Sequence, residues 1–290
     1  MTESRRGLAY GALAYGLWGV VAAYWKLLGD VDPIELIAHR AVWALVTFGA
    51  LIALTGQAAA FRRAMRDLRV VGLMGVSSVL LAINWVLFVW ATVTGHLLEA
   101  SLGYFINPLV SVALGTLLLR ERLSRLQWCA IALATAGVGV LTWKAGEVPL
   151  VALALAVSWG LYGLVRKVAR VEALVGSTIE TVLIAPVAVI YLAVLGGGEL
   201  ATGDATRIVL LAGTGVVTAV PLVLFTSAAK RLPLSTLGFT QYLAPTGQFL
   251  LAVIAYGEPL AHERLVAFAL IWAGLVVFSV DLYARRNKHT

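Results

Sequence analysis

The sequence predicts an all-α polytopic membrane protein with ten transmembrane helices, arranged as two inverted five-helix repeats. Composition, a series of long apolar runs and an internal repeat support this expectation. Hydrophobic residues make up 61% of the 290 residues, charged residues only 13%, and the mean hydropathy is +0.92. Soluble domains carry about 25% charged residues. The excess apolar surface therefore predicts a lipid environment.

Ten apolar runs have the length that a bilayer requires. A hydrocarbon core about 30 Å thick is crossed by about 20 residues of α-helix. The runs are continuous rather than alternating, which favours helices over the strands of a barrel. The expected spans are Leu8–Leu28, Ile34–Leu54, Val70–Thr92, Leu98–Leu119, Leu126–Trp143, Val148–Val165, Ser177–Leu195, Ile208–Ala229, Leu234–Tyr256 and Leu265–Tyr283.

Basic residues are concentrated in every second segment that joins these runs. Seventeen of the 22 Lys and Arg residues fall in the two terminal segments and in every second connector, four fall in the other connectors, and Arg40 lies inside a run. The positive-inside rule then predicts a cytoplasmic (inner) membrane protein with both termini in the cytoplasm. The net charge of +7 is spread over short connectors and forms no basic domain, so we expect no nucleic-acid partner.

The connector Ala58–Arg69 has its own pattern. Phe61, Met65 and Leu68 recur at helical spacing among four arginines. This pattern suits a short helix that lies on an anionic membrane surface. An ordinary positive-inside loop is the alternative interpretation.

The second half of the chain repeats the first. With an offset of 137 residues Pro108 aligns with Pro245, and with an offset of 141 Trp18 aligns with Trp159. The expected units are therefore residues 1–145 and 146–290. Each unit has an odd number of helices, so the second copy enters the membrane from the opposite side, an architecture typical of secondary transporters. Chance alignment of apolar helices is the alternative.

Several stretches carry a family resemblance. The segments are His96–Glu121, His39–Trp43, Asn84–Phe88, Tyr162–Lys167 and Leu234–Phe239. They resemble the EamA branch of the drug/metabolite transporter superfamily, and within it the chloramphenicol-associated RarD-type permeases. The resemblance covers nearly the whole chain. It implies ten helices, an inner-membrane location and the export or exchange of small molecules.

Ionisable residues inside the expected spans are functional candidates, because each costs about 2.5–3.5 kcal/mol at mid-helix. The pair His39 and Arg40 lies in the second run, and Glu180 lies in the seventh, at the position that aligns with His39. We expect Arg40 to bind an anionic or strongly polar substrate group. We expect His39 or Glu180 to be protonated in turn, which would couple transport to protons. The structural alternative is that Arg40 and Glu180 neutralise each other or bind helix ends.

The fourth and ninth runs carry matched polar stripes. We expect these stripes to line a cavity, with proline freeing a backbone carbonyl and providing a hinge in each helix. Helix–helix hydrogen bonding is the alternative. The residues are Tyr104, Asn107, Pro108 and Ser111 in one helix, and Gln241, Pro245 and Gln248 in the other.

Aromatic residues supply the apolar part of the expected pocket. Trp85, Trp159 and Tyr162 lie within runs and are candidates for stacking on a substrate, and Asn84 is a candidate polar contact. Packing is the alternative for each aromatic residue. Trp25 lies near the end of a run and is interpreted as an interfacial anchor.

Several motifs are absent. The sequence has no phosphate-binding Gly-x-x-x-x-Gly-Lys loop, no metal-ligand cluster and only one cysteine, Cys129, so no metal and no cofactor is expected. No nucleophile with a base is evident, so the chain is not expected to be an enzyme. The sequence thus predicts a secondary transporter that moves a small metabolite or drug by alternating access, as an exporter. A facilitator of the same fold and an intramembrane enzyme are the alternatives, and either a monomer or a homodimer fits.

Overall fold

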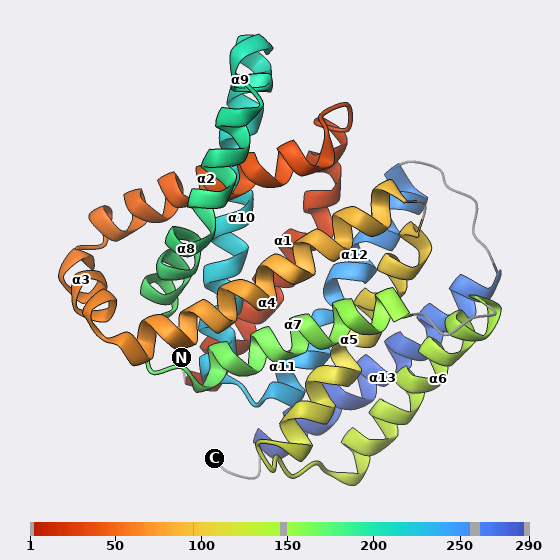
Figure 1. The fold of residues 1–290 in the computed structure, drawn as a ribbon. Helices are drawn as coiled ribbons and strands as arrows, with labels where there is room; N and C mark the ends of the chain where they lie inside the picture. Colours follow the sequence, from red (N-terminus) through yellow and green to blue (C-terminus); the bar gives the residue numbers. More distant parts are fainter. Residues whose placement is uncertain (1–2, 95, 146–149, 256–261, 287–290) are drawn as a thin grey trace.

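The computed structural model describes residues 3–94, 96–145, 150–255 and 262–286. Within these residues all regular structure is helical (Figure 1). Nine described helices are long and apolar enough to cross a membrane. They are α1 (Glu3–Lys26), α2 (Pro33–Leu54), α4 (Leu68–Val93), α5 (Leu97–Leu117), α6 (Arg125–Ala145), α7 (Leu150–Val168), α8 (Ala173–Val194), α10 (Ala205–Arg231) and α13 (His262–Arg286). These match nine of the ten expected runs.

The ninth expected run is divided. It forms α11 (Leu234–Gln241), α12 (Leu243–Leu250) and a π-helical segment η1 (Leu251–Ala255). Pro245 has no N–H to donate to the carbonyl of Gln241, so the α-helical ladder lacks a bond at this point. The interruption explains why this run is not among the continuous spans. Tyr256, its expected end, lies outside the described residues.

Two short helices complete the described structure, α3 (Ala58–Arg66) and α9 (Glu199–Thr202). The connector with four arginines is therefore helical. Its residues Phe61 and Met65 pack against the protein's main hydrophobic cluster, whereas Leu68 is 83% exposed and belongs to α4. The apolar face of α3 is thus occupied mainly by the protein itself.

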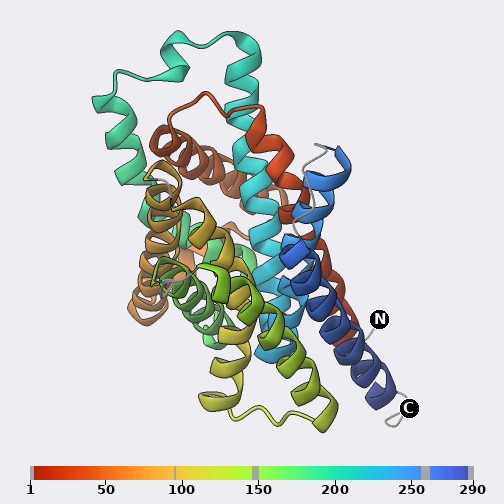
Figure 2. The same ribbon diagram turned by 90° about the vertical axis from the view of Figure 1, so that its right-hand side faces the viewer.

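The helices pack in pairs that join the two halves of the chain. Helix α1 packs against α10 and α12, α7 packs against α4 and α5, and α2 packs against α8. Helices α6 and α13 lie side by side at one edge of the molecule (Figure 1), and the two termini lie toward the end opposite α9 in both views (Figure 2).

Two glycines let α6 and α13 approach closely. A Cβ added at Gly137 would lie 2.8 Å from the Ala267 carbonyl oxygen, and one added at Gly274 would lie 2.9 Å from that of Ala130. Small residues at a helix crossing allow this backbone contact. Gly137 and Gly274 are 137 residues apart, and so are Ala130 and Ala267. Each helix therefore contacts the other through equivalent residues.

Glu121 contacts the second half of the chain. Its carboxylate accepts hydrogen bonds from the backbone N–H of Leu234 at 2.6 Å and of Ser235 at 2.9 Å. The positive end of the α11 dipole favours an anion there. The structure thus places the Glu121 carboxylate on the start of α11. Glu258, its repeat counterpart, lies outside the described residues.

Candidate functional site

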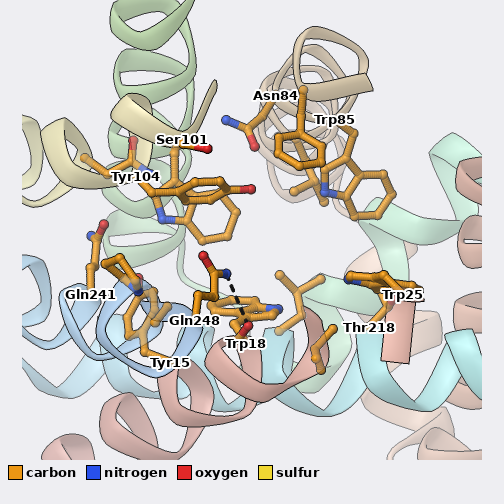
Figure 3. Close-up of a pocket in the computed structure, with 18 of the residues that line it drawn as sticks. Tyr15, Trp18, Trp25, Asn84, Trp85, Ser101, Tyr104, Thr218, Gln241 and Gln248 are labelled. Atoms are coloured by element: carbon orange, nitrogen blue, oxygen red, sulfur yellow. Dashed lines mark hydrogen bonds between the residues drawn. The ribbon is translucent and has the colours of Figure 1, made fainter. Parts of the chain in front are cut away.

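The helices enclose a cavity of about 310 Å³ between the two halves of the chain (Figure 3). Its size lies at the lower end of the range for small-molecule sites, about 300–1,000 Å³. Helices α1, α2, α4 and α5 from the first half and α7, α10, α11 and α12 from the second contribute to its wall. Helices α6 and α13 contribute no described lining residue. Helix α8, the seventh run, which carries Glu180, also contributes none among the described residues.

Aromatic rings form much of the cavity wall. The indoles of Trp18 and Trp159 meet edge to face with their centroids 5.4 Å apart, and the Phe88 and Tyr104 rings meet similarly at 5.9 Å. Trp85 faces this group from α4 (Figure 3). The sequence-predicted residues Trp85, Trp159 and Tyr104 therefore come together at one site.

Arg40 is held at the cavity by two aromatic rings. Its guanidinium carbon lies 4.7 Å from the centre of the Trp25 ring and 4.8 Å from that of Trp85. Such cation–π contacts stabilise a charge by about 0.5–2 kcal/mol. Its Nε also donates to the Thr218 hydroxyl at 3.3 Å. The interpretation of Trp25 as an interfacial anchor is thus incomplete, because its ring lines the cavity and supports Arg40.

Four amide side chains line the cavity, all from the predicted set. Asn84 donates at 3.0 Å to the Leu155 carbonyl and the Ser158 hydroxyl, and Gln248 donates at 3.5 Å to the Trp18 carbonyl (Figure 3). The other two are Asn107 and Gln241.

Asn107 and Gln241 each have a side-chain oxygen without a hydrogen-bond partner in the described structure. The Gln241 amide donates to the Ser111 hydroxyl at 2.8 Å, but its Oε1 is buried without a partner in the described structure, as is Oδ1 of Asn107. A buried polar atom without a partner is costly. Ser111 is 1% exposed and does not line the cavity, so it orients Gln241.

His39 lies outside the cavity. It has no solvent exposure, and its Nε2 is 3.3 Å from Glu35 Oε1. The same Glu35 oxygen accepts from the backbone N–H of Glu199 at 2.6 Å. His39 is therefore part of a link between α2 and the short helix α9, and Glu35 is a partner that the sequence argument missed.

Glu180 and Tyr162 also lie outside the cavity, in a second buried cluster. Arg166 Nη1 is 3.3 Å from Glu180 Oε1, and neither side chain is exposed. The Tyr162 hydroxyl donates to Glu180 Oε2 at 3.3 Å, and the Ser77 hydroxyl donates to Oε1. The ion-pair partner of Glu180 is thus Arg166 and not Arg40. Arg166 is one of the 17 basic residues that the sequence placed in the terminal segments and alternate connectors, because it falls at the end of an apolar run.

The two hinge candidates differ in their surroundings. Pro108 lies inside α5, which is continuous from Leu97 to Leu117, and it is not a lining residue. Pro245 lines the cavity at the start of α12, beside the interruption of the ninth run.

Charge at the cavity is one-sided. Among its described lining residues Arg40 is the only side chain that carries a full charge at neutral pH. Within the described ranges no group of three or more His, Cys, Asp or Glu residues is placed to hold a metal ion. The cavity is therefore suited to binding an organic molecule through one cation, several amides and aromatic surface.

Several lining residues were not singled out from the sequence, among them Tyr15, Ser101 and Thr218. A hydroxyl within an apolar run carries little signal, because Ser and Thr bond to the preceding turn in many membrane helices. Tyr15, Trp18 and Trp25 share one face of α1, but aromatic residues in an apolar helix do not alter its hydropathy pattern. Tertiary packing was needed to identify Tyr15, Ser101 and Thr218.

An all-helical membrane protein with a cavity between its two halves belongs structurally with the multi-pass transport proteins. Comparison with known sequences defines the group further. The profile of the EamA-like transporter family matches residues 5–143 and again residues 148–280, so the chain belongs to this family. The resemblance to the EamA branch is confirmed, as is the expectation of a membrane transporter at the level of class.

Curated relatives extend over nearly the whole chain. Protein RarD of Salmonella typhi is 43% identical over 290 residues, 99% of each chain. An uncharacterized transporter of Vibrio cholerae is 44% identical over 96% of this chain and 93% of its own. The chloramphenicol-sensitive protein RarD of Pseudomonas aeruginosa is 30% identical over 97% of this chain and 96% of its own. These relatives support the RarD-type assignment within the family.

A solved crystal structure shares the fold. It superposes with a TM-score of 0.74 and covers 93% of this chain and 96% of its own, at 22% identity. This similarity concerns the fold alone.

Proposed function

We propose that the protein is a secondary transporter that exports a small metabolite or drug across the cytoplasmic membrane by alternating access. The observation that carries this proposal is the cavity between the two halves of the chain, with Arg40 at its wall. A site walled by two halves can be exposed to either side when the halves change their packing.

The proposal includes ten spans in two inverted repeats, residues 1–145 and 146–290. In this arrangement α11, α12 and η1 together form the ninth span. Trp18 and Trp159, which align in the repeat, meet each other at the cavity. The reciprocal contacts of Gly137 and Gly274 at the α6–α13 crossing follow the same symmetry. Both observations support a pseudo-twofold relation between the halves.

In the proposed orientation both termini and α3 are cytoplasmic and α9 is external. The distribution of the basic residues supports it. Lipid and the transported molecule are then the expected partners, and either a monomer or a homodimer fits the fold.

The proposed substrate contacts are the predicted residues that line the cavity. They are Arg40, Asn84, Trp85, Tyr104, Asn107, Trp159, Gln241 and Gln248. Ser111 acts through Gln241, and Tyr162 acts through the rings it touches, since its centroid lies 5.3 Å from that of Trp159. Pro245 is the proposed hinge of the ninth span and Pro108 that of the fourth.

Proton coupling is assigned to the two buried groups outside the cavity. Protonation of Glu180 would remove its charge and weaken the contact with Arg166 that joins α8 to α7. Protonation of His39 would strengthen its contact with Glu35. Glu180 also accepts from the Ser77 hydroxyl of α4, and Glu35 accepts from the backbone N–H of Glu199. Each protonation therefore acts on a group that contacts the other half of the chain, which is what coupling requires.

The test is flux into proteoliposomes with and without an imposed pH gradient, over a panel of amino acids, aromatic acids and chloramphenicol. Accumulation driven by the gradient and lost in Arg40→Ala supports the proposal, with the exposed Arg63→Ala as the matched control. Saturable flux that ignores the gradient makes the protein a facilitator. Product formation without translocation makes it an enzyme.

A further inference from the structure

We propose that the cavity selects a flat aromatic monoanion that carries a hydroxyl group at the end opposite its acid group. A hydroxyaryl carboxylate is the simplest member of this class. The inference rests on the proposed transport function, because it names the substrate class of the same cavity. Three properties of the lining residues support it in turn: charge, aromatic surface and unused hydrogen-bonding capacity.

The charge of the cavity favours an anion. Arg40 has aromatic rings and one hydroxyl as its contacts, and among the described residues no carboxylate lies within 4.0 Å of it. A guanidinium in a water-poor site is better stabilised by a carboxylate, which accepts two parallel hydrogen bonds from it. A ligand acid group would supply that missing partner.

The same charge distribution disfavours an ammonium group. No acidic side chain occurs among the described residues that line the cavity. The amine of an amino acid or of a cationic drug would therefore lose its hydration without gaining an ion pair, which is costly. A monoanion is thus expected to bind better than the corresponding zwitterion, amine or neutral amide.

The middle of the cavity is shaped for a ring. Trp18, Trp85 and Trp159 line the cavity. Trp18, Trp85 and Tyr104 are seen around its interior in Figure 3. Aromatic ligands bind such walls through offset or edge-to-face contacts. A molecule with a planar body can make these contacts while its acid group reaches Arg40.

The far end of the cavity has amides without partners. In Figure 3, Gln241 lies on the side opposite Trp25 and Thr218, two of the three residues that contact Arg40. Gln241 and Asn107 are 4% and 6% exposed, and each has a buried carbonyl oxygen with no partner in the described structure. A ligand hydroxyl can donate to an amide oxygen or accept from an amide nitrogen, so it satisfies either orientation of these groups.

The test is a set of four compounds that share one ring and differ in charge. They are 4-hydroxyphenylacetate, 4-hydroxyphenylacetamide, tyramine and tyrosine, and their dissociation constants are measured by calorimetry on the purified protein. We expect the acid to bind about 10-fold or more tightly than the amide, because it adds a charged hydrogen bond. Stronger binding of tyrosine or tyramine than of the acid would overturn the proposal.

Removal of the hydroxyl tests the far end. We expect phenylacetate to bind about 2–10-fold more weakly than 4-hydroxyphenylacetate, the worth of one neutral hydrogen bond. Equal affinities for phenylacetate and 4-hydroxyphenylacetate would show that the amides do not hydrogen-bond to the ligand hydroxyl. That result would overturn this part of the proposal.

Two variants assign each preference to a residue. Arg40→Gln should lower the affinity of the acid more than that of the amide and so reduce the preference for the acid. Asn107→Leu should lower the affinity of 4-hydroxyphenylacetate more than that of phenylacetate and so reduce the preference for the hydroxylated acid. Each variant serves as the control for the other. A thermal melt of each protein excludes a general loss of folding, and Gln241→Met replaces Asn107→Leu if the latter does not fold.

Flux separates this inference from the proposed function. Proteoliposomes are assayed with the tightest ligand of the set and with the wider panel. If a hydroxyaryl acid binds but does not cross, the transport function fails and the ligand class stands. If no member of the set binds while another compound is transported, the ligand class fails and the transport function stands.

Discussion

The guanidinium of Arg166 and the carboxylate of Glu180 form an ion pair in the interior, with Nη1 3.3 Å from Oε1 and neither side chain exposed. The pair joins α7 to α8. Arg166 also donates to the Ala173 carbonyl at 2.9 Å, and a Cβ at Gly176 would lie 2.2 Å from Nη1. The absence of a side chain at position 176 therefore leaves the space that the guanidinium occupies.

Loss of either charge of this pair is expected to destabilise the protein by about 3–5 kcal/mol, because the remaining charge is buried without a partner. The effect should be unequal. In Arg166→Met the Glu180 carboxylate can take up a proton, whereas in Glu180→Gln the arginine cannot lose one. We therefore expect Glu180→Gln to lower the melting temperature of the purified protein more than Arg166→Met.

The double variant Arg166→Met with Glu180→Gln should be more stable than Glu180→Gln alone, since no charge is left unpaired. Asp30→Asn is the exposed control, as it removes the surface ion pair with Arg207. The hydrogen bond from Arg207 lowers the pKa of the Asp30 carboxyl, so the small contribution of this pair is present at neutral pH and is lost as the pH falls through that lowered pKa. A larger loss in Asp30→Asn than in Glu180→Gln would contradict this account.

Gly215→Ala should destabilise the contact between α10 and α2. The added methyl group would lie 2.2 Å from the Trp43 carbonyl oxygen and 2.4 Å from its carbon, both backbone atoms that cannot move independently. Overpacking of this kind costs about 1–3 kcal/mol. Gly49→Ala in α2 is the matched control, because nothing lies within 4 Å of its added methyl. Unfolding in denaturant should show a loss for the first variant and a gain of about 0.5–1 kcal/mol for the second.

The proposed orientation is open to a direct test, since Cys129 is the only cysteine. In a Cys129→Ser background, Ala201→Cys in α9 and Arg63→Cys in α3 place exposed thiols on the two sides of the membrane in the proposed orientation. A membrane-impermeant thiol reagent applied to intact cells should label the first variant and not the second. Both should react after permeabilisation. The reverse pattern would invert the assignment of the termini.

The two prolines are expected to differ in their effect on transport. Pro245→Ala restores a backbone donor beside the interruption of the ninth run, so α11 and α12 can form one continuous helix. We expect a several-fold lower rate of flux with little change in ligand affinity. Pro108→Ala, in a helix that is already continuous, should change flux less. A flux in Pro245→Ala equal to that of the unmodified protein would show that the interruption at Tyr242 is not a hinge.

The membrane spans could be predicted from the sequence because the bilayer imposes a long-range pattern on it. The nine continuous helices agree with nine predicted runs, because a span must be both long and apolar whatever its neighbours are. The division of the ninth run into α11, α12 and η1 was not predicted. Pro245 indicated a bend there, but the division into α11 and α12 on either side of Tyr242 is seen only in the tertiary structure.

The candidate site was likewise predicted from the sequence only in part. Arg40 and the four cavity amides were identified, since a polar group inside a span is rare enough to attract attention. His39 is adjacent to Arg40 in sequence, yet it points to Glu35 and not into the cavity. Adjacent residues of a helix are about 100° apart around its axis, so sequence proximity does not place two side chains on one face.

The sequence by itself determined that this protein is a helical membrane protein of the EamA-like family, because hydropathy, charge asymmetry and family motifs are properties of the chain alone. The tertiary structure decided which polar groups meet. Glu180 pairs with Arg166, and Arg40 is held between Trp25 and Trp85 without a carboxylate among the described residues. The reason is physical: a buried charge is stabilised by groups within a few ångströms of it, and packing alone decides which residues from distant helices come that close.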